Sequence, residues 1–237
     1  MSDLALAAFA AETGAHVVEE PRERRFARFR RGFDESGFRA SLVARDLRFV
    51  GRSEHRYPRL LRELHDPPPG LFLRGATDAG RLGLPAVAVV GARACSSYGS
   101  QIARLLGREL AAAGLTVVSG LARGVDGEAH RGALEAGGST VAVLGCGIDR
   151  DYPAAHAQLA ARICEGGLVV SEYAPGVEPA PWRFPARNRE SPRGMRVPLN
   201  HAVRSRRRCA GIVWRCGPGV VSVEGWAARR QPGAHAR

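Results

Sequence analysis

The chain has 237 residues, of which 45% are hydrophobic, a size and composition that fit one sizeable α/β domain with an appendage. Its 35 basic residues are all arginine, since the sequence contains no lysine, and with 23 acidic residues they give a net charge of +12. The lack of lysine excludes Walker-A nucleotide hydrolases, protein kinases and enzymes with a Schiff-base lysine. The excess of arginine makes nucleic acid or another polyanion the first partner to consider.

The cysteines and the N-terminus exclude further classes of protein. The five cysteines form no C-x-x-C pair and have no zinc-like spacing to histidine, so we expect free thiols, no metal site and no cofactor. The apolar stretch 1–11 follows no basic region and is much shorter than a spanning helix. The sequence therefore predicts a soluble, cytoplasmic protein without membrane contact.

Residues 1–56 form the first predicted region. Four aromatic residues recur there at roughly helical spacing, which predicts a short helical unit: Phe26, Phe29, Phe33 and Phe38. The segment 57–64 predicts one or two further helical turns, which the prolines at 67–69 bring to an end. A short extended piece at 71–73 follows.

From Pro85 onward, short apolar runs alternate with helical stretches. Strands are predicted at 86–90, 116–119, 140–144 and 167–170, and helices at 100–113, 127–136 and 154–164. Uninterrupted apolar strands that alternate with helices are typical of a parallel sheet covered on both faces. The predicted fold class is α/β, with a doubly wound Rossmann-like parallel sheet over 57–189, whose ligands bind where loops leave the carboxyl ends of the strands.

The loop after the first of these strands has the residue types of an anion site. Its glycines allow close backbone approach, the following helix offers free N–H groups, and an arginine can donate two hydrogen bonds to a phosphate. A tyrosine can stack on a base, and a serine can cap the helix. The residues predicted to bind are Gly91, Arg93, Ser96, Tyr98 and Gly99. A tight turn with a capped helix and a solvated arginine explains the same residues.

The second strand-end loop predicts another anion cradle, formed by Ser119, Gly120, Arg123 and Gly124. Asp126 and His130 follow it four residues apart, so on a helix they share one face and can bond each other. A hydrolytic pair with a histidine base is one interpretation. We favour the other, in which the aspartate interacts with the helix dipole and the histidine holds loops together, because no nucleophile accompanies the pair.

The third loop contains Gly145 and Gly147 and resembles the start of a G-x-G-x-x-G motif, but Arg150 stands at the third glycine position. No acidic residue ends the second strand to hold a ribose, so dinucleotide binding is weakly supported. Cys146 is interpreted as a buried structural thiol rather than a nucleophile, since a nucleophile needs an activating base nearby.

Taken together, the loops resemble the bacterial DNA-processing protein A family, also called Smf. The shared motifs run, in order, through Gly91-x-Arg93-x-x-Ser96-x-Tyr98-Gly99, Ser119-Gly120-Leu121-Ala122-x-Gly124-Val125-Asp126, Ala129-His130, Leu144-Gly145-x-Gly147, Tyr152-Pro153, Ser171-Glu172-Tyr173 and Phe184-Pro185-Ala186-Arg187-Asn188-Arg189. An upstream segment from Tyr57 to Pro68 also looks like that family's lead-in. The resemblance covers roughly 57–189, and the order of several separate motifs makes it specific.

The resemblance implies a non-catalytic protein that binds and protects incoming single-stranded DNA during natural transformation and helps load RecA. It assigns DNA contact to the basic positions of the first two loops, here Arg93 and Arg123, and adds Arg187 and Asn188 to the predicted DNA-binding residues. Family members form homodimers through later parts of the domain. Dimerisation of this chain is doubtful, because its sequence departs from the family pattern in that part. The N-terminal region of 1–56 is short and weakly patterned compared with the family's helical sterile-alpha-motif-like domain.

The segment 190–237 departs from the family pattern, because the apolar helix and strand that complete the sheet are missing there. It holds 10 Arg and 2 Glu, a balance of +8, whereas residues 1–189 hold 25 Arg and 21 acidic residues, a balance of +4. We therefore expect a sheet that is incomplete at its C-terminal edge and exposed to aggregation. The abrupt loss of periodicity leads to the hypothesis that the tail is an out-of-frame translation of a GC-rich gene.

Two other functions stay open. A nucleotide-processing enzyme of the phosphoribohydrolase type can use the same fold, but its P-G-G-x-G-T loop with a following glutamate is missing from this sequence. A small-molecule or nucleotide sensor would use the strand-end pocket without catalysis.

The frame hypothesis predicts that an alternative frame of the gene, translated from close to Arg189, encodes an apolar helix and a strand. Resequencing the gene and translating that frame checks this. A confirmed sequence whose other frames contain no such helix and strand would contradict it.

Overall fold

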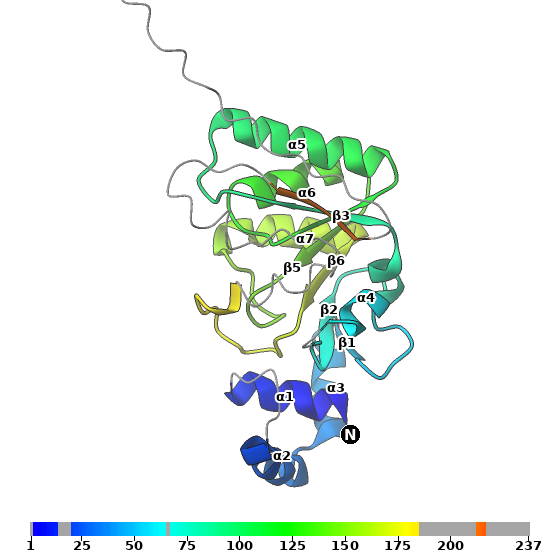
Figure 1. Ribbon diagram of the computed structural model, residues 1–237, viewed down its shortest axis with the longest axis vertical. Coiled ribbons are helices and arrows are strands. Elements are labelled where there is room, and N and C mark those ends of the chain that lie inside the picture. The colour runs from blue at the N-terminus through cyan, green and yellow to red at the C-terminus, as the bar shows by residue number, and fades with distance from the viewer. Residues whose placement is uncertain (1, 14–19, 65–66, 185–211, 217–237) are drawn as a thin grey trace, which may run out of the picture.

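The computed structural model describes residues 2–13, 20–64, 67–184 and 212–216. Over these residues the chain forms one seven-stranded mixed sheet in the order β1-β2-β6-β5-β4-β3-β7. The strands β3, β4, β5 and β6 pair in parallel, while β1, β2 and β7 are antiparallel to their neighbours. Figure 1 shows the N-terminal helices at the β1 end of the molecule and α5 at the opposite end.

The N-terminal unit contains three helices, α1 (Asp3–Thr13), α2 (Glu20–Gly32) and α3 (Glu35–Val43). Their contact is aromatic, because the ring of Phe9 lies 5.4 Å from the rings of both Phe26 and Phe29. The carboxylate of Asp34 caps α3 by accepting a hydrogen bond from a backbone N–H of its first turn at 2.9 Å. The helical spacing of the phenylalanines in the sequence is thereby explained.

Strand β1 (Leu47–Gly51) follows α3 and pairs with β2 (Gly70–Arg74), with α4 (Arg59–Arg62) between them. The sequence pattern does not predict β1, because these five residues show little alternation and follow directly on a helical pattern. Since β1 belongs to the sheet, the sheet begins before the expected domain boundary at 56. The division into domains otherwise stays a prediction.

The parallel core follows the predicted alternation closely. Its strands are β3 (Ala86–Val90), β4 (Thr116–Ser119), β5 (Thr140–Val143) and β6 (Leu168–Ser171). Its helices are α5 (Ser97–Ala112), α6 (Val125–Glu135) and α7 (Ala157–Gly166), with 3-10 turns η1 (Ala79–Gly83) and η2 (Ala154–His156). The α/β class with a parallel core is confirmed.

The helices cover the sheet unevenly. Because β3 to β6 step across the sheet in one direction, right-handed crossovers place α5, α6 and α7 side by side over one face (Figure 1). Val89, Val117 and Ala129 form part of the apolar cluster beneath α5 and α6. On the other face, Tyr57 and Ala79 from the α4 and η1 region join a cluster with side chains of β2, β5 and β6.

Two glycines allow α5 and α6 to touch backbone to backbone. A Cβ atom at Gly107 of α5 would overlap the carbonyl oxygen of Ala129, and one at Gly132 of α6 would overlap the carbonyl oxygen of Arg104. This close approach fixes where α6 starts relative to α5. It therefore also fixes the two strand-end loops that lead into these helices.

Strand β7 (Ile212–Cys216) corrects the expectation of an open sheet edge. It pairs antiparallel with the whole of β3, from Ala86 opposite Cys216 to Val90 opposite Ile212. The β-branched and aromatic residues of β7 favour extended structure, and an unpaired strand edge is a ready template for them. The strand therefore closes the edge that the sequence pattern left open.

The rest of the segment 190–237 lies outside the described residues, as do Arg187 and Asn188. No helix of the described ranges is long and apolar enough to cross a membrane.

Candidate nucleic-acid interface

The loops after β3 and β4 touch each other through their backbones. The N–H of Val125 donates a hydrogen bond of 3.1 Å to the carbonyl of Ala92. Gly124 lies so close to this loop that a Cβ atom would overlap the carbonyl oxygens of Ala92 and Arg93. Arg93 and Arg123 therefore extend from two loops that are held together at the carboxyl ends of β3 and β4.

The second loop needs an unusual backbone to make this contact. Gly124 has a φ of +75°, which L-amino acids with side chains rarely adopt, and Leu121 has a φ of +58°. The side chain of Leu121 is fully buried, and its carbonyl accepts a hydrogen bond of 2.9 Å from Nδ1 of His156. The loop is thus held from below as well as from the side.

Four predicted binding residues present exposed side chains on these loops: Arg93, Ser96, Tyr98 and Arg123. Tyr98 is 64% exposed, so its ring is free to stack. The hydroxyl of Ser96 accepts a hydrogen bond of 3.1 Å from the N–H of Gly99 and caps α5. Capping was the more conservative interpretation of this serine, and the structure bears it out.

Aromatic side chains lie beside the first loop. Tyr152 and Phe184 stack with their ring centres 5.4 Å apart, and the guanidinium of Arg93 lies 5.0 Å from the centre of the Phe184 ring. Trp182 lies two residues before Phe184 in the sequence and is 47% exposed. The guanidinium of Arg183 lies 4.8 Å from the centre of the Trp182 ring. We call Tyr152, Trp182 and Phe184 the aromatic shelf.

The aromatic shelf is absent from the binding residues that the sequence predicts. Tyr152 and Phe184 belong to motifs that carried the family resemblance, so a signal for them existed, whereas nothing in the sequence indicated Trp182. A Cβ atom at Gly145 would approach the Phe184 ring to 2.8 Å, which explains why the third loop has glycine at this position. The glycine allows the shelf to lie directly on the loop.

The third loop is held by the segment that follows β6. The N–H of Gly147 donates a hydrogen bond of 2.8 Å to the carbonyl of Val177, and the N–H of Ile148 donates one of 3.3 Å to the carbonyl of Tyr173. The hydroxyl of Ser171 donates 2.6 Å to the carbonyl of Cys146. Cys146 itself is 1% exposed, which confirms the structural interpretation of this thiol.

Several predicted binding residues are buried beneath the loops. The hydroxyl of Ser119 donates a hydrogen bond of 2.5 Å to the carbonyl of Val89. The carboxylate of Asp126 accepts a hydrogen bond of 3.4 Å from the N–H of Ala122. The buried members of the predicted set are Ser119, Gly120, Asp126, His130, Gly145 and Gly147. The side chains of Ser119, Asp126 and His130 face the interior beneath the loops, and their contact with a ligand stays a prediction.

His130 illustrates this supporting role. The hydroxyl of Thr140 donates to the carbonyl of Val117 at 2.8 Å and therefore accepts the Nδ1–H of His130 at 2.7 Å. Burial lowers the pKa of His130 from 6.5 to about 3, and electrostatic repulsion from His156 and Arg131 acts in the same direction. The imidazole is therefore neutral at neutral pH and ties α6 to β5.

These properties argue against a hydrolytic pair of Asp126 and His130. A general base works best with a pKa near the working pH and must reach the substrate. His130 is 0% exposed and has a pKa far below neutral. His130 instead has a structural role, because its hydrogen bond to Thr140 joins α6 to β5.

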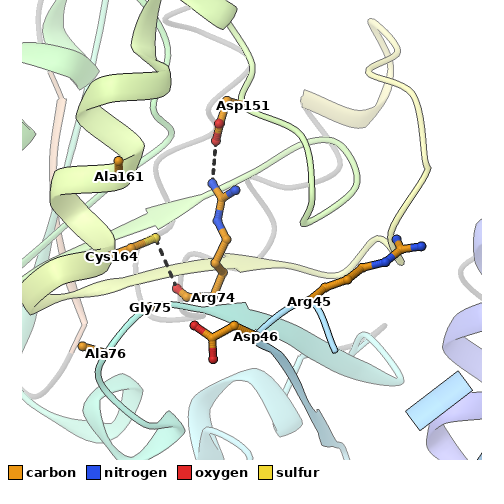
Figure 2. A pocket seen from close by; sticks show the side chains of 8 residues that line it. All are labelled: Arg45, Asp46, Arg74, Gly75, Ala76, Asp151, Ala161 and Cys164. Carbon is orange, nitrogen blue, oxygen red and sulfur yellow. Dashed lines mark hydrogen bonds and ion pairs between the residues drawn. The ribbon is translucent and has the colours of Figure 1, made fainter. Parts of the chain in front are cut away.

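A pocket of about 440 Å³ lies between the β1–β2 edge and α7 (Figure 2). Arg74 extends through it to Asp151, with 2.5 Å between the two charged groups, whereas Arg45 points away. Burial acts to lower the pKa of Arg74, but the hydrogen bond and charge of Asp151 outweigh it and raise the pKa. The ion pair anchors the end of the third loop to β2.

The Cys164 thiol also lines this pocket and donates a hydrogen bond of 3.8 Å to the carbonyl of Arg74. Burial raises the pKa of Cys164, so the thiol stays protonated. It is free of any disulfide, as are Cys95 and Cys146. Among the described ranges, no three His, Cys, Asp or Glu residues are grouped so that they could hold a metal ion.

Comparison with known families identifies the fold and its loops. The family model of the DNA recombination-mediator protein A matches residues 48–190, which include every strand-end loop described above. The chain belongs to this family. The match begins inside β1, in agreement with the finding that β1 is part of the sheet.

Curated members of the family align over the same part of the chain. The Smf protein of Synechocystis is 42% identical over 143 residues, which cover 60% of this chain and 36% of that protein. The DNA processing protein DprA of Streptococcus pneumoniae is 47% identical over 133 residues, which cover 56% of this chain and 46% of that protein. The chain thus spans less than half the length of these family members.

Solved structures of the family share the fold. The DprA structure from Streptococcus pneumoniae superposes with a TM-score of 0.60 and 37% identity, covering 70% of this chain and 56% of that one. A DprA structure from Helicobacter pylori, described for its single-stranded DNA binding mode, gives a TM-score of 0.53 and 34% identity. It covers 60% of this chain and 62% of that one.

The neutral state of His130 predicts a specific pH dependence of stability. Because its pKa is lower in the folded protein than in the unfolded chain, the unfolded chain binds the proton first, and stability falls as pH drops below 6.5 towards 3. The contribution is at most about 2 kcal/mol between pH 7 and pH 5. Urea unfolding of the wild type and of His130→Asn measures it, since asparagine keeps a donor towards Thr140.

The variant should lose less stability than the wild type over this pH range. An equal loss in both proteins would show that His130 is not the buried neutral group described here.

Proposed function

We propose that this protein binds single-stranded DNA at the carboxyl ends of β3 and β4 and acts in DNA processing during natural transformation. The observation that carries the proposal is the backbone contact between the two loops, which holds Arg93 and Arg123 on adjoining segments. Membership of the family and the described DNA binding of the Helicobacter pylori neighbour support it.

The chemistry of the surface suits a single strand. Guanidinium groups form paired hydrogen bonds with phosphate oxygens, and the N-terminus of α5 adds the favourable end of a helix dipole. Exposed aromatic rings stack on bases without regard to sequence. Arg93 lies over Phe184, so a phosphate at Arg93 would place the adjoining base beside the aromatic shelf.

The proposal separates contact residues from supporting ones. Exposed Arg93, Ser96, Tyr98 and Arg123 would touch the strand. Gly91 and Gly124 would let the two loops that carry these side chains pack together, and Gly99 would close the first turn of α5 against Ser96. Arg187 and Asn188 stay predicted contacts, although both lie outside the described residues. The buried residues of the set hold the loops in place.

We propose that binding occurs without turnover. Asp126 and His130, whose spacing in the sequence suggested a hydrolytic pair, are both buried, and the low pKa of His130 makes it a very weak base. A nucleotide-processing activity would instead appear as release of a base from a nucleotide.

We also propose that the bound strand is passed to RecA, as the family resemblance implies. This part of the proposal concerns the whole protein, and the chain spans less than half of its curated relatives' length. Dimerisation, which the resemblance also implies, is expected to be weakened here by the atypical tail.

The DNA-binding proposal predicts that Arg93→Ala with Arg123→Ala weakens binding of oligo-dT. Loss of two phosphate contacts should lower the salt dependence of log K by about 1.4 and the affinity by roughly tenfold or more at about 0.1 M salt. Fluorescence anisotropy over a salt series measures both quantities.

The matched control is Arg108→Ala with Arg162→Ala, which removes the same charge from the exposed later turns of α5 and α7. It should leave binding nearly unchanged. Equal losses in the two double variants would reject the assignment to the strand-end loops, and base release from nucleotides by the wild type would favour the enzyme instead.

RecA loading predicts faster RecA filament formation on oligonucleotides covered by single-strand-binding protein, with no such gain for the Arg93→Ala, Arg123→Ala variant. The rate of RecA ATP hydrolysis reports filament formation. A wild-type protein that binds the strand yet leaves this rate unchanged would contradict the RecA part alone.

A further inference from the structure

Helix α2 holds a disproportionate share of the positive charge. Its 13 residues contain six arginines and two glutamates, a balance of +4. The other 176 residues up to residue 189 contain 19 arginines and 19 acidic residues, so they are neutral overall. The net positive charge of this part of the chain therefore resides in one helix, which the strand-end site does not use.

The charges of α2 are sorted by face. Phe26 is buried, and with Phe29 and Phe33 it faces the N-terminal core at positions i, i+3 and i+7. Arg24, Arg28 and Arg31 follow the spacing i, i+4 and i+7 on the opposite face, and all three are exposed. We call these three residues the arginine stripe, which spans about 10 Å along the helix axis.

The phenylalanine face of α2, opposite the arginine stripe, borders a groove that lies on the side of the strand-end site. A groove of about 510 Å³ has Phe29 and Phe33 on one wall and the segment 174–178 with Arg183 on the other. Figure 1 shows this segment, in yellow, between the parallel core and α1. Arg183 directly precedes Phe184 of the aromatic shelf, so the same segment borders both α2 and the strand-end loops.

We propose that the arginine stripe is a second phosphate-binding surface for single-stranded nucleic acid, reached by a strand that leaves the strand-end loops across the 174–184 segment. This inference rests on the proposed function, because it extends the path of the same ligand. Three arginines on one helix face suit a repeating phosphate backbone and read no sequence.

The faces of α2 favour nucleic acid over a membrane. A helix that lies on a bilayer buries an exposed apolar face among the lipids. In α2 the phenylalanine face is already packed against α1, where Phe9 contacts both Phe26 and Phe29. On the opposite face the exposed side chains of the stripe are arginines, which recognise phosphate groups in water without apolar insertion.

The length of the ligand separates this surface from the strand-end site. The test variant is Arg24→Gln, Arg28→Gln, Arg31→Gln, since glutamine removes charge and keeps helix propensity. Its control is Arg56→Gln, Arg108→Gln, Arg162→Gln, which removes the same charge from other exposed positions. Binding is measured with oligo-dT of about 6 and about 30 nucleotides, lengths chosen to fill one site or to extend well past it.

With the long oligonucleotide, the slope of log K against log salt should be less steep by about 2 in the test variant than in the wild type. Its affinity should be up to roughly 100-fold lower at about 0.1 M salt. With the short oligonucleotide, it should bind like the wild type. The control variant should bind both oligonucleotides almost normally, and circular dichroism should show that all three proteins keep the same helix content.

Equal binding of the long oligonucleotide by the test variant and its control would overturn the inference and leave the strand-end proposal intact. Conversely, if Arg93→Ala with Arg123→Ala leaves binding unchanged while the stripe variant abolishes it, the strand-end proposal fails, and the path from those loops to the stripe fails with it. Vesicles with anionic lipids provide the remaining comparison. A stripe variant that loses vesicle binding and keeps oligonucleotide binding would assign the stripe to a membrane surface and overturn the inference.

Discussion

The contact between the first two strand-end loops determines the rest of the site. A hydrogen bond from Val125 to Ala92, and a glycine at position 124 that no other residue can replace without overlap, join the ends of β3 and β4. The close approach of α5 and α6 fixes the same loops from their helical sides. Two flexible arginine side chains thus start from one rigid base, which lowers the entropy lost when both bind one ligand.

Much of this architecture follows from local sequence patterns. Apolar runs of strand length alternate with amphipathic helices from 86 to 171, and this alternation alone predicts a parallel core with loops at one edge. Glycines at strand ends predict the loops that approach a ligand or each other. Strand β1 escaped prediction because its five residues have no periodicity of their own and depend on pairing with β2.

Burial and long-range contacts were beyond the sequence. Ser119 and His130 have the residue types of a binding or catalytic site, yet the structure turns both inward to hydrogen-bond Val89 and Thr140. The placement of Phe184 beside Arg93 joins residues 91 positions apart, and only the path of the chain after β6 reveals it. The pairing of β7 with β3 is equally non-local, since it joins residues more than 120 positions apart in the sequence.

The position of the positive charge in the structure matters more than the net charge of the chain. The total of +12 suggests a basic protein throughout, but up to residue 189 the excess lies in α2, and the loops contribute single, well-placed arginines. Affinity would then come from a few positioned contacts supplemented by one basic helix. Strong salt dependence is expected of such a surface even though most of the described chain is electrically balanced.

Hydrogen exchange of the backbone amides, with and without oligo-dT, tests the central claim most directly. If the joined loops hold the strand, binding should slow exchange at 91–97 and at 121–125 together, and leave the buried amides of β1 and the last turn of α7 unchanged. Protection of neither loop, under conditions where the oligonucleotide is bound, would contradict the account.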